Sequence, residues 1–135
     1  MKTMRRPVVL AVILVAFIAT GAAIADHHVV KITSKDGVGK YLTDAKGMTL
    51  YIFKMDSPGK SACGGPCVEN WPLYYQETVE AAAGLTAGEF GVVTRGDGRK
   101  QTTYKGMPLY YFAGDKKPGD MNGQGLKEAW YAAAP

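Results

Sequence analysis

The sequence predicts an all-β fold in which two related β-hairpin units form one compact domain. The eleven residues from Lys46 to Asp56 recur as Lys105 to Asp115, with seven identities at a constant offset of 59. Turn residues such as Gly and Pro recur at short intervals, and long helical patterns are scarce. The chain that remains after a predicted signal peptide has about 110 residues, which is the size of a single domain.

Residues 1–25 have the organisation of a secretory signal peptide. Basic residues precede the uncharged apolar run 8–19, and Ala23-Ile24-Ala25 has the small-x-small pattern of a cleavage site. The apolar run is shorter than the roughly 20 residues that a membrane-spanning helix needs. We expect export, cleavage after Ala25 and no membrane span afterwards. Because no cysteine lies near the cleavage site to carry a lipid, we expect a soluble periplasmic or secreted protein.

The basic charge of the chain belongs mainly to the predicted signal peptide. The whole chain has a net charge of +4, and cleavage removes the positive charges of Lys2, Arg5 and Arg6. The remaining net charge of +1 includes no cluster of Lys and Arg of the kind that binds phosphates. We therefore expect no nucleic-acid partner.

Behind the signal peptide, we expect an N-terminal segment or strand at 26–37 and a repeat domain at 38–135. The half-units of this domain are expected at about 38–72 and 98–133. β-prone runs and the turns between them predict strands at 29–33, 38–43, 48–53, 90–95, 100–104, 107–112 and 130–133, with one short helical turn at 66–70. Residues 77–83 are rich in Ala and Glu and fit either a helix or a surface loop.

Each half-unit is predicted to be a hairpin. Gly47 and Gly106 supply the turn between a β-prone segment and a second strand. Both faces of this second strand are apolar, so we expect it to be buried on both sides. The acid that follows it, Asp56 or Asp115, begins a Pro-Gly turn. We expect its carboxylate to accept backbone N–H bonds within that turn.

The repeat contains a motif of two aromatic residues followed by an acid. The motif residues are Tyr51, Phe53 and Asp56 in the first copy and Tyr110, Phe112 and Asp115 in the second, and Trp71 and Trp130 follow at matching positions. This ordered set resembles a bacterial secreted-repeat family of predicted lipoproteins, whose motif is Tyr-x-(Phe/Trp/Tyr)-x-x-Asp. The resemblance covers about residues 38–133 and implies the fold and the export. It implies no chemistry, because the function of that family is not established. We predict that the motif residues and both tryptophans are structural.

Cys63 and Cys67 are the only cysteines, and Gly-Gly-Pro separates them. This spacing differs from the Cys-x-x-Cys of thioredoxins, and no His follows Cys67 as haem attachment requires. In an oxidising compartment an isolated pair predicts one structural disulfide. A redox-active dithiol is the alternative interpretation.

The new N-terminus offers a candidate metal site. Cleavage after Ala25 would make Asp26, His27 and His28 the first three residues. An α-amine, two backbone nitrogens and the third-position imidazole then offer a square-planar site for Cu(II). We favour a solvated terminus that binds copper only adventitiously, and a physiological copper site is the alternative.

The sequence does not assemble a catalytic constellation. Because His27 and His28 are the only histidines, no Ser-His-Asp or Cys-His arrangement is available in the repeat domain. The aromatic pairs Tyr74-Tyr75 and Tyr110-Tyr111 fit a core better than a ligand groove. We expect a non-catalytic module without a cofactor that binds a protein or another ligand of the cell envelope. The alternative is an envelope copper or redox protein that uses Asp26, His27 and His28 or the cysteine pair.

Overall fold

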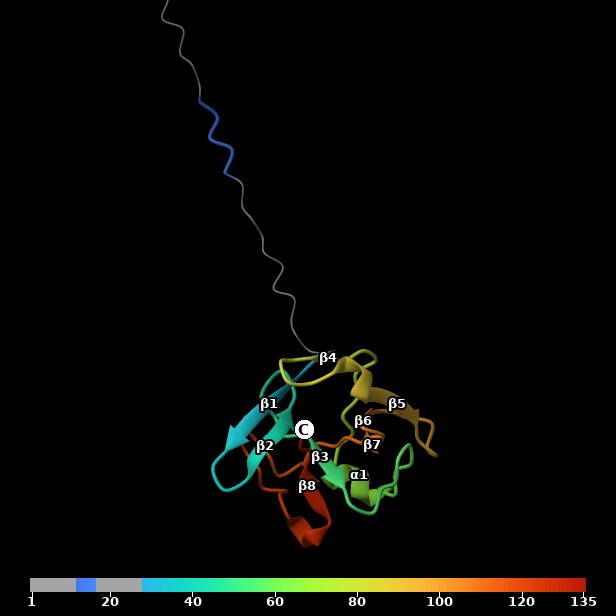
Figure 1. Ribbon diagram of the computed structural model, residues 1–135. Helices are drawn as coiled ribbons and strands as arrows, with labels where there is room; N and C mark the ends of the chain where they lie inside the picture. Colours follow the sequence, from blue (N-terminus) through green and yellow to red (C-terminus); the bar gives the residue numbers. More distant parts are fainter. Residues whose placement is uncertain (1–11, 17–27) are drawn as a thin grey trace, which may run out of the picture.

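The computed structural model describes residues 12–16 and 28–135 (Figure 1). Most of the predicted signal peptide lies outside the described residues, as do Asp26 and His27 of the predicted copper site. Within the described ranges, no helix is long and apolar enough to cross a membrane.

Short strands dominate the described part of the chain, so the prediction of an all-β fold is confirmed. In chain order the elements are β1 (Val29–Lys35), β2 (Gly39–Thr43), β3 (Tyr51–Phe53), α1 (Pro66–Asn70), β4 (Glu80–Ala81), the 3-10 turn η1 (Ala87–Glu89), β5 (Phe90–Thr94), β6 (Lys100–Tyr104), β7 (Met107–Pro108), the 3-10 turn η2 (Leu126–Glu128) and β8 (Trp130–Ala132). Residues 77–83 form a loop that contains β4 and no helix.

These strands form three small sheets around one centre. Their orders are β2-β1-β4, β3-β8 and β5-β6-β7. β1 is antiparallel to β2 and parallel to β4. β5 and β6 form a hairpin around Asp97-Gly98, as the sequence predicts.

Both predicted hairpins form at their turns, where Thr43 bridges to Thr49 and β6 pairs with β7, but the second strand of each then continues away from its hairpin. In the first half-unit the pairing with β2 ends at a bridge between Thr43 and Thr49. The chain then continues as β3, which pairs with β8 from the end of the second half-unit. In the second half-unit Tyr110 leaves β6 and bridges to Leu73. A two-stranded hairpin is marginal alone, and the exchange gives each motif strand a partner from the other half.

Backbone hydrogen bonds repeat this exchange with approximate two-fold symmetry. Ala133 N–H donates to the Leu50 carbonyl at 2.8 Å, and Tyr74 N–H donates to the Leu109 carbonyl at 3.1 Å. Each bond ties the end of one half to the motif strand of the other. The two halves therefore form one interlocked body.

The exchange encloses two neighbouring core clusters. One contains Val30, Leu42, Leu50, Tyr74, Tyr104, Leu109 and Ala133. The other contains Tyr51, Cys63, Trp71, Tyr110 and Trp130. The second cluster holds most of the motif aromatics and forms the base of the candidate site.

The turn glycines also contact the opposite half. Gly47 has φ 87° and Gly106 has φ 83°, which only glycine adopts without strain. A Cβ atom on Gly47 would lie 3.1 Å from Pro118 Cβ, and one on Gly106 would lie 3.1 Å from Pro58 Cβ. Each Lys-Gly turn therefore packs against the Pro-Gly loop of the other half.

The variant Gly47→Ala tests this packing against Gly37→Ala. Gly37 has φ 79°, and a Cβ atom there would meet nothing within 4 Å, so alanine incurs only the backbone penalty of about 1–2 kcal/mol. Alanine at Gly47 must also displace Pro118, and we expect a further loss of about 1–3 kcal/mol. Denaturant unfolding measures both variants. Equal losses would show that the Gly47–Pro118 contact is unimportant.

Candidate functional site

The motif tyrosines and acids meet across the two halves. Tyr51 Oη donates to Asp115 Oδ2 at 2.7 Å, and Tyr110 Oη donates to Asp56 Oδ2 at 2.7 Å. All four side chains are buried. The backbones of Tyr51 and Tyr110 also exchange two hydrogen bonds, of 2.8 and 2.9 Å. The motif therefore joins the halves through side chain and backbone together.

The second oxygen of each carboxylate holds the loop that follows it. Asp56 Oδ1 accepts the Ala62 N–H at 2.6 Å, and Asp115 Oδ1 accepts the Asn122 N–H at 2.9 Å. The predicted bonds within the Pro-Gly turns are not the ones formed, and this expectation is corrected. A buried carboxylate needs strong donors, and the partner tyrosine and the far end of the loop supply them.

Burial keeps these tyrosines protonated. It raises the pKa of Tyr110 to about 12, and the Asp56 hydrogen bond and charge add to the rise against an opposing hydrogen bond from Ser61. Burial and Asp115 likewise raise the pKa of Tyr51. Burial raises the pKa of Asp56 too, although Ala62 N–H, Tyr110 and Arg95 oppose it. Both phenols therefore act as hydrogen-bond donors at neutral pH.

Next to these pairs, the motif phenylalanines and both tryptophans form a stack of four rings. Ring centroids lie 4.2 Å apart between Phe53 and Trp130, 3.7 Å between Trp130 and Trp71, and 4.5 Å between Trp71 and Phe112. Tyr51 meets Trp71 edge-on at 5.4 Å, and Tyr110 meets Trp130 edge-on at 5.1 Å. Such pairs contribute about 0.5–1.5 kcal/mol each beyond area burial. The stack crosses both halves and makes the centre rigid.

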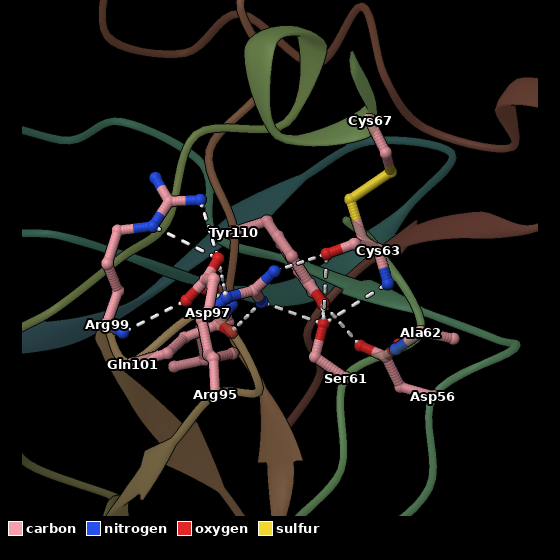
Figure 2. The surroundings of a disulfide bond; sticks show 11 residues. Asp56, Ser61, Ala62, Cys63, Cys67, Arg95, Asp97, Arg99, Gln101 and Tyr110 are labelled. Atoms are coloured by element: carbon pink, nitrogen blue, oxygen red, sulfur yellow. Dashed lines mark hydrogen bonds and ion pairs between the residues drawn. A yellow bond between two sulfur atoms is a disulfide. The ribbon is translucent and has the colours of Figure 1, made fainter. Parts of the chain in front are cut away.

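A disulfide joins Cys63 to Cys67, which confirms the predicted pairing. Figure 2 shows the loop around it and the guanidinium that holds it. Arg95 Nη1 donates to Ser61 Oγ at 2.8 Å, and Nη2 donates to the Cys63 carbonyl. Because the Tyr110 hydroxyl donates its hydrogen bond to Asp56, the Ser61 hydroxyl is the donor in the 2.6 Å bond to the Tyr110 oxygen. The loop is thereby connected to the motif.

Arg95 is a residue of this site that the sequence pattern does not reveal. It is buried among Ser61, Gln101 and Cys63, and Gln101 Oε1 accepts from Nη1 at 2.7 Å. In the sequence it precedes Gly-Asp-Gly and has the appearance of an exposed turn residue. Only the fold places it over the disulfide loop.

A groove opens beside the tryptophan pair. It has a volume of about 430 Å³ and is lined by Phe53, Met55, Pro66, Cys67, Asn70, Trp71, Lys127, Ala129 and Trp130. The Met55 side chain is 69% exposed at its rim. Both halves contribute to the lining, so the groove exists only because the halves interlock. This groove is the candidate binding site.

The remaining predicted site residues lie elsewhere. His28 Nδ1 hydrogen-bonds Gln76 Oε1 at 2.8 Å. Among the described residues, no group of three or more His, Cys, Asp and Glu is arranged to hold a metal. The copper site stays a prediction, because Asp26 and His27 lie outside the described residues. The redox interpretation of the cysteines also stays a prediction; Cys63 is buried and Cys67 is half-buried.

Removal of one tyrosine–carboxylate bond tests the link between the halves. Asp115→Asn and Tyr51→Phe are each expected to lower the free energy of unfolding by about 1–3 kcal/mol, because a buried partner loses its hydrogen bond. A double-mutant cycle should show coupling of at least about 0.5 kcal/mol. The exposed acid Asp36 provides the control Asp36→Asn, which should be neutral. Additive effects would exclude a direct role for this bond.

Alkaline pH provides a second test. The unfolded chain loses the Tyr110 proton near pH 10, whereas the folded protein keeps it to about pH 12. The folded state binds more protons in this window, so the free energy of unfolding falls as the pH rises from 10 to 12. Tyr110→Phe should make this fall shallower in denaturant unfolding at stepwise pH. A slope that is unchanged in the variant would contradict the burial of this phenol.

Comparison with known families agrees with the two-fold character of this site. The model of a family described as a secreted repeat of unknown function matches the chain twice, over residues 32–74 and 91–134. No curated protein matched the chain, and no solved structure did. Each matched copy contains one tyrosine of the reciprocal pairs and one tryptophan of the stack. The chain therefore belongs to this family of secreted repeats and carries two copies of the repeat in one domain.

Proposed function

We propose that the protein is a non-catalytic module of the cell envelope that binds a short apolar protein segment in the groove beside Trp71 and Trp130. The observation that carries the proposal is the groove itself, which combines an aromatic floor with the exposed thioether of Met55. Ligand sites of this kind are concave and mostly apolar, with a few polar groups that orient the ligand. Here Asn70 and Lys127 are those groups.

The flexible rim and the rigid floor have different tasks in this proposal. Met55 is unbranched and polarisable, so its side chain adapts to the shape of an apolar ligand. The floor belongs to the four-ring stack and needs no rearrangement before binding. A preorganised floor reduces the entropy that binding must overcome.

Backbone strain at the rim also supports a binding role. Lys127 and Glu128 both have φ 54°, a left-handed conformation that is costly outside glycine. Such strain costs about 1–3 kcal/mol per residue and gathers at ligand sites. Glycine at position 127 would relieve it but would remove the cation from the groove.

The non-catalytic part of the proposal rests on the use of the polar side chains. Asp56 and Asp115 are buried, and both oxygens of each accept a hydrogen bond from the protein. Tyr51 and Tyr110 donate hydrogen bonds to these acids. The acids and phenols that could act in catalysis are thus engaged in holding the halves together. Export to the envelope with cleavage after Ala25 completes the proposal.

The variant Met55→Glu tests the groove with anilinonaphthalene sulfonate, an apolar anionic dye, as the probe. We expect saturable binding that changes the tryptophan fluorescence, and at least about tenfold weaker binding by the variant, because it places a charge at the apolar rim. Val38→Glu is the matched control, since Val38 is 39% exposed and outside the groove lining. It should bind the dye like the wild type.

A photo-crosslinking amino acid at position 55 then tests for the partner in cells. We expect a discrete crosslinked protein at position 55 and none at position 38. Dye binding that both Glu variants weaken equally, or crosslinks of equal yield at both positions, would overturn the groove as the binding site.

A further inference from the structure

The outer edge of β5 has free backbone hydrogen-bonding groups. Arg95 N–H donates to the Arg99 carbonyl, and Lys105 N–H donates to the Glu89 carbonyl. In an antiparallel pair only every second residue hydrogen-bonds the neighbouring strand. The register of β5 and β6, together with these two bonds, shows that the odd-numbered residues of β5 hydrogen-bond β6. Val92 therefore directs its N–H and C=O to the other side, as does Thr94. Within residues 28–135, no strand pairs with that side.

This edge lacks the usual protection against pairing. Natural edge strands carry charges, proline or bulges that prevent association. β5 reads Phe-Gly-Val-Val-Thr and contains none of these residues. The Val92 side chain is 43% exposed, and the strand lies at the periphery of the molecule (Figure 1). The edge is available to another strand.

The two ends of β5 have opposite charge. Arg99 and Lys100 lie at the hairpin tip after β5 and outnumber Asp97 there. Glu89 precedes β5, and Glu77 lines a cavity of about 240 Å³ together with Phe90 and Val92. Lys105 lies beside Glu89 and offsets one of these two charges, so this end keeps a net negative charge. An antiparallel second copy of the strand would set each basic tip beside the acidic start of the other. A parallel copy would set like charges together.

We propose that β5 pairs antiparallel with β5 of a second copy of this chain, across a two-fold axis at Val92. The two Val92 residues exchange two backbone hydrogen bonds. Each Thr94 N–H donates to the Phe90 carbonyl of the partner copy, which adds two more. The Phe90 N–H takes no part, because it donates to the Ala87 carbonyl within its own chain. The result is one continuous six-stranded sheet, β7-β6-β5 joined to its copy.

The charge pattern favours a second copy over an unrelated peptide. In this register Glu89 of the partner copy lies opposite Arg95. Arg95 begins the hairpin tip, and Arg99 lies in the same tip. None of the residues of β5 lines the groove beside Trp71, so dimerisation leaves that groove open. The two proposals therefore fail independently.

Sedimentation equilibrium of the purified chain tests the dimer. The strand is short, so we expect a weak dimer with a Kd of about 10–500 µM. Val92→Lys should weaken it at least about tenfold, because it places like charges at the axis. The matched control Val38→Lys has a similar exposure, 39% against 43%, and should dimerise like the wild type. A chain that is monomeric at about 1 mM, or equal weakening by both variants, would overturn the proposal.

Two further measurements identify the contact. Amide hydrogen exchange at Val92 and Thr94 should slow as the protein concentration rises, while exchange in β2 should not change. Arg99→Glu should weaken the dimer, and adding Glu89→Arg should restore it, because the charge pair is then reversed. Exchange at Val92 and Thr94 that is independent of concentration in a dimeric sample would place the interface elsewhere. Failure of the double variant to recover would exclude the antiparallel register.

Discussion

The hydrogen bonds from Tyr51 to Asp115 and from Tyr110 to Asp56 set the constraint on which the rest of this structure depends. A buried carboxylate is tolerated only with strong donors, and here the tyrosine that donates to each acid belongs to the opposite half. Each half therefore satisfies only one oxygen of its own acid, through the loop that follows it, and the other oxygen depends on the opposite half. Two further contacts join one half to the other in this crosswise way. β3 pairs with β8, and each turn glycine packs against a proline of the opposite half.

This crosswise arrangement explains where the groove lies. The tryptophans are brought face to face at 3.7 Å because each follows a motif strand that has crossed to the other half. The disulfide loop covers one side of the stack, and Arg95 ties this loop to Ser61 and hence to Tyr110. The space beside the stack, between Met55 and Lys127, then receives lining residues from both halves. The candidate binding site therefore lies where the two repeats meet.

The two repeats are equivalent in backbone but differ in their surroundings. Asp56 belongs to a network with Ser61, Arg95 and the disulfide loop, whereas Asp115 holds a loop in which Gly123 occupies the position next to Trp71. A Cβ atom at Gly123 would approach the Trp71 ring to 2.7 Å, so the second loop passes the stack without a side chain. The groove is lined by Phe53 and Trp130 and not by Phe112, so it lies at one end of the four-ring stack. The two repeats form a frame with approximate symmetry, and the candidate site lies where their surroundings differ.

The sequence by itself determined the repeat, the β class, the helical turn Pro66–Asn70, the hairpin around Asp97-Gly98 and the disulfide, because local pattern and spacing encode these features. Only the tertiary structure decided that β3 leaves its hairpin, that each motif acid bonds the tyrosine of the other half, and that Arg95 is buried. These outcomes depend on which long-range partner satisfies a buried polar group or an open strand edge. Several residues far apart in the chain could serve as that partner, and the sequence pattern does not indicate which of them is used.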